Sequence, residues 1–252
     1  MTHRLRLAGL VVSLAILACA LFRIALSMPQ FGRHPFPYGQ AINRLAPAQR
    51  HVSNMVSAVT FDYRGFDTLG EEFMLVGAVS GAAILLRGFR GEQPTARPVQ
   101  IPGRPVPPPS DAVMLIARLI GPLMMLFGLD VVLHATVTPG GGFQGGAVIA
   151  SGTLLLWIGE GYRGWRSIVR TWWLDVVEGG GALGFALSGL IPLCFGGGFM
   201  ENMLPYGKFR DMLSGGLMQI ENASVALAVA AGFVLLFLEF LEETRAPEDD
   251  QQ

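Results

Sequence analysis

The chain has 252 residues, of which 51% are hydrophobic and 15% charged, and its formal net charge is −1. A charge this close to zero excludes the basic surface that nucleic-acid-binding proteins need, and the two cysteines offer no metal-ligand spacing. The apolar residues come in long blocks with the charges between them, which indicates an integral membrane protein and not a soluble domain.

Six apolar blocks are candidates for membrane-spanning helices, since a helix needs roughly 20 mostly apolar residues to cross a bilayer. These blocks are residues 7–26, 69–86, 112–133, 143–158, 174–195 and 215–238. We therefore expect an all-α integral membrane protein with about six transmembrane helices. The first block could be a signal peptide, because Arg4 and Arg6 precede it, but its length and the closing Arg23 favour a retained helix.

The stretch between the first two blocks contains no clear span. Within it, residues 50–61 place four apolar side chains at helical spacing, namely Val52, Met55, Val56 and Val59. About twelve residues are too few to cross a bilayer, so we expect a short amphipathic helix on the outer face. A seventh crossing helix is the alternative, which the distribution of basic residues disfavours.

A linker divides the chain into two parts. Residues 89–110 are rich in proline and arginine, which indicates an extended, solvated segment. A two-helix part, residues 1–88, precedes the linker, and a four-helix part, residues 111–243, follows it. Residues 244–252 form an acidic tail.

Arginine-rich segments set the expected orientation, because Lys and Arg concentrate in cytoplasmic loops. The linker and residues 163–170 each carry at least three arginines. Placing both inside gives a multi-pass protein of the inner (cytoplasmic) cell membrane with both termini in the cytoplasm. The fit is partial, since Lys208 and Arg210 then fall outside.

A glycine-rich segment, TPGGGFQGG, lies between two of the blocks. Residues 140–145 match the G-x-G-x-x-G pattern, but a dinucleotide site requires a preceding strand within a βαβ unit. Because a membrane helix precedes this segment, we expect a structural turn and no cofactor. Gly142, Gly146 and Ala150 recur at every fourth position, which lets another helix approach closely. The structural loop comprises Thr138, Pro139, Gly140, Gly141, Gly142, Phe143, Gln144, Gly145 and Gly146.

This loop resembles the signature loop of the MnhB (MrpB) subunits of the Mrp-type multisubunit Na⁺/H⁺ antiporters, which the membrane arm of ion-coupled hydrogenases shares. The stretches EGGGALGFALSGL and LSGGLMQIEN resemble the same family. FDYRGFDTLGE, residues 61–71, resembles a segment of the E-type subunits of hydrogenases and of the C-terminal end of the large A-type subunits of the antiporters. The chain is thus similar to a fusion of an E-like segment, residues 1–88, with an MnhB-like domain, residues 111–243.

Ionisable groups inside membrane spans are costly and are therefore functional candidates. Glu178, beside three glycines in an apolar helix, is the first candidate to carry a proton or bind a cation. The alternative is that Glu178 lies at the level of the lipid headgroups and not in an ion path. Asp130 and His134 share a helix face at i,i+4 spacing, and either relay a proton or form a boundary pair.

Three further acids complete the candidates for the ion or proton path. Glu221 begins the last span beside Asn222, and their oxygens would suit a cation. Asp67 and Glu71 lie at the outer boundary, where an acidic rim would collect Na⁺. A helix cap is the alternative role for Asp67.

No catalytic triad, thiol nucleophile or metal-ligand cluster occurs in the sequence, so we expect a component of a transporter and not an enzyme. The resemblance implies a membrane subunit of a cation/proton antiporter complex that helps to form the ion path. It implies as partners the large A- and D-like subunits, the small C-, E-, F- and G-like subunits, Na⁺ and H⁺, and no nucleic acid. Two alternatives stay open: the same module in an ion-pumping hydrogenase or related respiratory complex, and a purely structural packing subunit.

Overall fold

The computed structural model describes residues 3–28, 36–92 and 109–243, in which every regular element is a helix. Six of these helices are long and apolar enough to cross a membrane, which confirms the expected number. They are α1 (His3–Ser27), α4 (Gly65–Glu92), α5 (Asp111–Leu133), α6 (Gly142–Ile168), α7 (Thr171–Cys194) and α8 (Leu217–Glu243). Most of the expected linker (93–108) and the expected acidic tail (244–252) lie outside the described residues.

The chain divides into two compact units, residues 1–41 and 42–252. In the first unit, α1 presents large apolar side chains around its whole circumference, and none of its apolar span is buried. A helix that is apolar on every side and of this length is typical of a membrane span.

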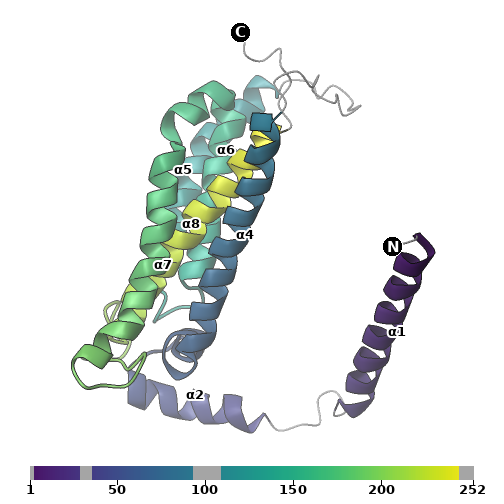
Figure 1. The fold of residues 1–252 in the computed structure, drawn as a ribbon. Helices are drawn as coiled ribbons and strands as arrows, with labels where there is room; N and C mark the ends of the chain where they lie inside the picture. The colour runs from purple at the N-terminus through teal and green to yellow at the C-terminus, as the bar shows by residue number, and fades with distance from the viewer. Residues whose placement is uncertain (1–2, 29–35, 93–108, 244–252) are drawn as a thin grey trace. The chain divides into compact units, whose positions relative to one another are not determined.

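The second unit is a helix bundle with α8 at its centre, in contact with α4, α5, α6 and α7 (Figure 1). Of the apolar span of α8, 61% is buried, against 39% for α6 and for α7 and 11% for α4. Small buried residues on α8 let the neighbouring helices approach its backbone. These residues are Ala226, Ala228, Ala231 and Gly232.

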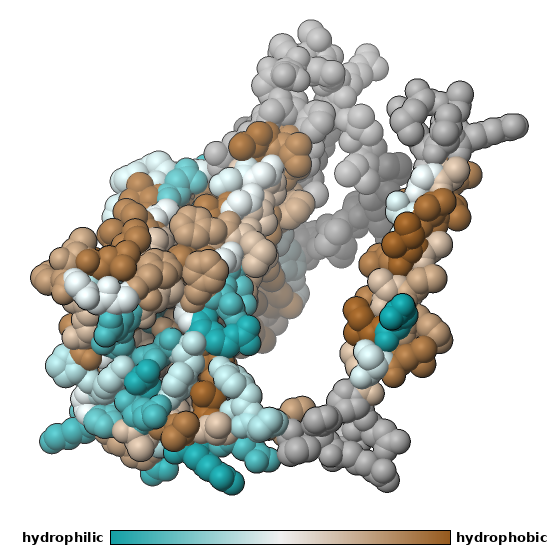
Figure 2. Space-filling model, turned by 60° about the horizontal axis from the view of Figure 1, so that its bottom comes forward, coloured by the Kyte–Doolittle hydropathy of each residue, from teal (hydrophilic) through white to brown (hydrophobic). Residues whose placement is uncertain are grey.

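Consecutive helices of the bundle run up and down, so two loops meet at one end. Residues 134–141 connect α5 to α6, and residues 195–216 connect α7 to α8. We call this the glycine-loop end. Figure 2, which is turned toward it, shows hydrophilic residues gathered there and mainly hydrophobic residues on the flank of the bundle. Polar ends with an apolar flank are the distribution that a bilayer requires.

The segment before α4 differs from the expected single amphipathic helix over residues 50–61. It forms α2 (Pro37–Arg50), the short α3 (Met55–Ala58) and a π-helical turn, η1 (Val59–Tyr63). The helix breaks after Arg50 because His51 adopts a positive φ of 55°. The amphipathic helix is α2, whose buried residues Ile42 and Ala46 lie four apart.

Candidate ion path and its supporting loop

Asn54 holds the glycine loop from the first part of the chain. Its buried side-chain amide donates hydrogen bonds to three carbonyl oxygens between residues 135 and 140, at 2.7, 3.0 and 3.2 Å. The backbone N–H groups of Ser53 and Asn54 both donate to the carbonyl oxygen of Thr136 at 3.1 Å. The approach to α6 is therefore fixed by a buried polar network.

Asn222 of α8 binds the start of α6. Its Oδ1 accepts a hydrogen bond from the N–H of Gly142 at 2.8 Å, and its Nδ2 donates to Ser57 Oγ at 3.1 Å. The first N–H of a helix has no acceptor within the helix, so Asn222 supplies the cap that Gly141 has no side chain to provide. Gly140 and Gly141 have φ values of 151° and 153°, which side chains disfavour.

Small residues bring α6 close to α8. A Cβ atom at Gly146 would lie 2.8 Å from the carbonyl oxygen of Ala226, and one at Gly142 would overlap the carbonyl oxygen of Asn222. The helix that approaches the stripe of Gly142, Gly146 and Ala150 is thus α8 of the same chain. Close backbone approach of this kind favours helix association in lipid.

Other small-residue positions differ in their neighbours. On α7, a Cβ at Gly181 would lie 2.6 Å from the backbone nitrogen of Ala228, whereas one at Gly180 would meet no atom within 4 Å. Gly77 and Gly81 of α4 also have no atom of the described chain within 4 Å of a Cβ position. This face of α4 is therefore open among the described residues.

Among the described residues, three of the buried carboxyl groups have one oxygen without a hydrogen-bond partner: Glu72 on α4, Glu178 on α7 and Glu221 on α8. The three residues are 2%, 6% and 2% exposed. Glu221 Oε1 accepts a hydrogen bond from Ser188 Oγ at 3.1 Å. Glu178 lies against Gly232, where a Cβ would come within 2.9 Å of Glu178 Oε1. Because an unpaired buried carboxylate is costly, such groups are suited to hold a proton or a cation.

Glu72 is not among the candidates from the sequence, although a signal for it was present. Thr68, Glu72 and Val79 follow the i,i+4,i+11 spacing of one helix face, and all three are buried. The adjacent Glu71 is exposed. The period of α4 thus distinguishes the two neighbouring glutamates.

The remaining candidates lie at the glycine-loop end. Asp130 Oδ1 lies 3.1 Å from His134 Nδ1, and the Asp130 side chain is largely exposed. Arg64 pairs with Asp67, and both side chains are more than half exposed. Because α4 begins at Gly65, Asp67 lies inside its first turn. The alternative role of Asp67, as the capping residue that precedes the helix, is therefore wrong.

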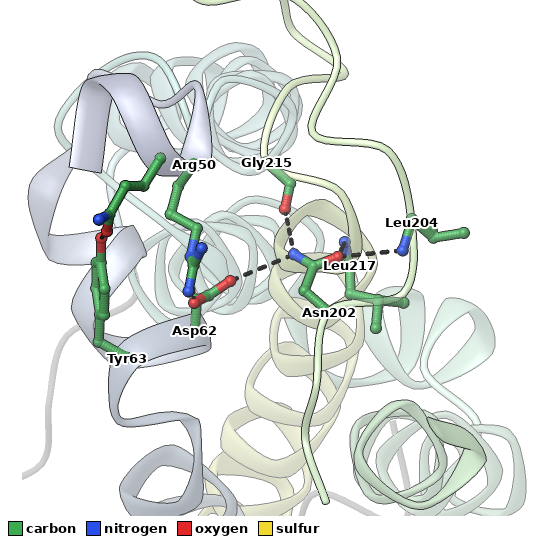
Figure 3. A network of polar contacts seen from close by, with 8 residues as sticks. Arg50, Asp62, Tyr63, Asn202, Leu204, Gly215 and Leu217 are labelled. Carbon is green, nitrogen blue, oxygen red and sulfur yellow. Dashed lines mark hydrogen bonds and ion pairs between the residues drawn. The ribbon is translucent and has the colours of Figure 1, made fainter. Parts of the chain in front are cut away.

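Arg50 and Asp62 connect the segment before α4 to the α7–α8 loop (Figure 3). Arg50 Nε lies 2.5 Å from Asp62 Oδ1, and Asn202 Nδ2 donates to Asp62 Oδ2 at 3.4 Å. The guanidinium lies over the rings of Tyr63 and Tyr206, 5.0 and 5.2 Å from their centroids. Burial lowers the pKa of Arg50, but its hydrogen bond to Asp62 and the charge of that carboxylate raise the pKa above its usual value overall. The pair therefore stays charged and fastens the two segments.

Comparison with known families and proteins identifies two relations. The domain related to the MnhB subunit of the Na⁺/H⁺ antiporter matches residues 112–235, which extend from α5 into α8. The uncharacterized protein MJ1307 of Methanocaldococcus jannaschii is 31% identical over 203 residues, a match that covers 72% of this chain and 74% of that protein.

Two solved complexes contain a chain of similar fold. A chain of the membrane-bound sulfane sulfur reductase, an archaeal respiratory membrane complex, superimposes with a TM-score of 0.69 and 25% identity, over 94% of this chain and 98% of that one. A chain of the Mrp complex from Dietzia sp. DQ12-45-1b also gives a TM-score of 0.69, with 21% identity over 98% of this chain. The present chain spans only 27% of that longer chain, and this second likeness shows the fold alone.

Proposed function

Because this chain belongs to the same family as MJ1307 and carries an MnhB-related domain, we propose that it is a membrane subunit of a multisubunit cation/proton antiporter complex. In that complex it lines part of the ion path and holds neighbouring subunits. The likeness to chains of two multisubunit membrane complexes supports this assignment.

The observation that carries the proposal is the set of three buried carboxyl groups, each with an unpartnered oxygen. Glu72, Glu178 and Glu221 come from three different helices that pack together. Inside a membrane protein, such groups mark proton relays and cation paths, because their ionised form needs a counter-charge. If a proton and a cation exchange at these carboxyl groups, the negative charge is neutralised by the proton in one state and by the cation in the other.

The spacing of these acids supports a role shared with other subunits. Glu221 lies on α8, and Glu178 lies against Gly232 of the same helix. Eleven residues of helix separate positions 221 and 232 by roughly 16 Å, at 1.5 Å per residue. Direct transfer of a proton over that distance is excluded, so intervening water or groups from neighbouring subunits must complete the path.

In this proposal Asp130, His134, Asp67 and Glu71 form the acidic approach at the glycine-loop end.

The two parts of the chain act together in this proposal. Residues 1–88 correspond to the E-like segment of hydrogenases and residues 111–243 to the MnhB-like domain. The packing of α4 on α8 and the hydrogen bonds from Asn54 to the glycine loop support one functional unit. The partners would be the large A- and D-like and the small C-, E-, F- and G-like subunits. The open face of α4 around Gly77 and Gly81 would suit close packing against one of them.

A second candidate function is the same module in a respiratory complex, where redox chemistry in other subunits drives ion pumping. This alternative is favoured by the similarity to a chain of the sulfane sulfur reductase. The two chains are 25% identical, and the match covers 98% of the reductase chain.

Purification of the tagged chain from its native membrane tests the proposal. We expect other membrane subunits to copurify, and vesicles containing the complex to acidify or alkalise when a Na⁺ gradient is imposed without any electron donor. Copurification of iron–sulfur or other redox subunits, with ion movement that requires an electron donor, would support the respiratory alternative. Isolation of the chain alone would contradict both.

A further inference from the structure

A cavity of about 250 Å³ lies between the segment before α4 and the glycine loop. Its wall includes η1 and the first turns of α4 on one side, and Gly140, Gly141 and Gln144 on the other. Val56 of α3, Phe143 of α6 and Val225 of α8 contribute apolar side chains to the lining. At about 30 Å³ for each water molecule, the cavity has room for several waters or a partly hydrated ion.

Glu72 is the buried charged side chain on this wall. It is 2% exposed, and its Oε2 has no hydrogen-bond partner. The charged groups that act on it are both acidic: Glu71 on the same helix and Glu178 on α7. Among the described residues, therefore, no basic side chain neutralises the carboxylate, and a proton or a bound cation must do so.

Neutral oxygen atoms on the same wall could complete a cation's coordination. Thr60 and Thr68 line the cavity. The hydroxyl of Thr68 donates its proton to the carbonyl oxygen of Thr60 at 2.5 Å. The lone pairs of this hydroxyl oxygen therefore point away from Thr60 and are free to bind a cation. The side-chain amide of Gln144 lies across the cavity. Carboxylate, hydroxyl and carbonyl oxygens are the ligands of hard cations. Glu71 also lines the cavity but is exposed, so Glu72 is the buried carboxylate of the lining, and a single buried charge matches a monovalent cation better than a divalent one.

We propose that this cavity is a binding site for a partly hydrated monovalent cation of the Na⁺ class, with the carboxylate of Glu72 as its anionic ligand. This inference rests on the proposed antiporter function and assigns one of its ion-binding positions. A proton and the cation compete for Glu72, so the carboxyl group is neutralised in both states. The glycine loop forms the opposite wall and brings Gln144 and the Gly141 backbone next to the ion.

Labelling of the purified complex with a hydrophobic carbodiimide tests the site directly, because this reagent modifies protonated carboxyl groups in apolar surroundings. Peptide mass spectrometry locates the modified residue. We expect Glu72 to react, and we expect NaCl to slow the reaction, whereas choline chloride at the same ionic strength does not. By mass action, Na⁺ at tenfold excess over its dissociation constant slows labelling about tenfold. Glu160, which is exposed and lies 2.9 Å from Arg118 Nε, is the control for the specificity of the reagent and should stay unlabelled with or without Na⁺.

The measurement needs only the native complex, so it does not depend on the folding of a variant. Labelling of Glu72 at a rate that Na⁺ leaves unchanged, or no labelling of Glu72, would overturn the inference. A Glu72→Gln variant should lose the Na⁺-sensitive label, and its persistence would also overturn the assignment. Na⁺/H⁺ exchange by the wild-type complex is measured in parallel: exchange without protection of Glu72 refutes the site alone, whereas protection without exchange refutes the proposed function alone.

Discussion

Asn54 and Asn222 bind the same glycine-rich segment on the two sides of Gly141. Asn54 donates to carbonyl oxygens that precede Gly141, and Asn222 accepts from the first N–H that follows it. The two asparagines come from opposite parts of the chain, and Asn222 also donates a hydrogen bond to Ser57 in α3. The glycine loop therefore joins the segment before α4 to α8, the last helix of the bundle.

Replacement of Asn222 by Ala should destabilise the bundle. The N–H of Gly142 would stay buried without an acceptor, which costs about 1–3 kcal/mol. The midpoint of thermal unfolding in detergent should fall, while Asn43→Ala, at an exposed position of α2, should leave it unchanged. Equal midpoints for Asn222→Ala and the wild type would show that the bond does not hold the loop.

Gly146→Leu should separate α6 from α8, since even a Cβ at this position would lie 2.8 Å from the carbonyl oxygen of Ala226. The variant should lose both thermal stability and copurifying subunits, because close helix packing drives association in lipid. Gly146→Ala should show a smaller effect in the same direction. A variant that assembles normally and loses only ion transport would place the loop in the ion path and contradict its packing role.

Arg50→Ala should destabilise the protein by about 1–3 kcal/mol, because it leaves a nearly buried carboxylate without its counter-charge. The Asp62 side chain is 7% exposed. Arg64→Ala is the matched control, since its pair with Asp67 is exposed and such pairs contribute about 0–1 kcal/mol. Chemical denaturation in detergent measures both. The double variant Arg50→Ala, Asp62→Ala should recover part of the loss, and failure to do so would exclude the ion pair as its cause.

The orientation in the membrane is tested by single cysteines at two exposed prolines in a background without Cys19 and Cys194. Pro205 lies in the loop at the glycine-loop end, and Pro109 lies just before α5 at the opposite end. An impermeant thiol reagent should label Pro205→Cys from outside intact cells and Pro109→Cys only after the membrane is opened. The reverse pattern would invert the expected topology.

The transmembrane helices could be predicted from the sequence because the length of an apolar block is a local property. Each of the six blocks overlaps a helix, and α5 differs from its block by one residue at the start. The break at His51 could not be predicted in this way, because apolar spacing continued across it. Its positive φ belongs to a loop in which Ser53 and Asn54 donate hydrogen bonds to carbonyl oxygens of residues 135–140. No local sequence pattern reveals partners this distant in the chain.

The site was predicted only in part, for a similar reason. Glu178 and Glu221 stood out as acids within apolar blocks, and both are buried. Glu72 lies in a cluster of acids at the start of α4, and the helix face that it shares with Thr68 and Val79 is the signal that separates it from the exposed Glu71. Asn54 acts through tertiary hydrogen bonds to a distant loop, and its residue type alone predicts no such role.

The most direct test of the ion-path role is Na⁺/H⁺ exchange by Glu178→Gln in inverted membrane vesicles. Glutamine keeps the size of the side chain but can neither release a proton nor carry a negative charge. We predict that the variant complex assembles with its full set of subunits and loses exchange, whereas the control Glu160→Gln, at an exposed glutamate, retains it. Undiminished exchange by an assembled Glu178→Gln complex would contradict the proposal that this buried carboxyl carries the ion.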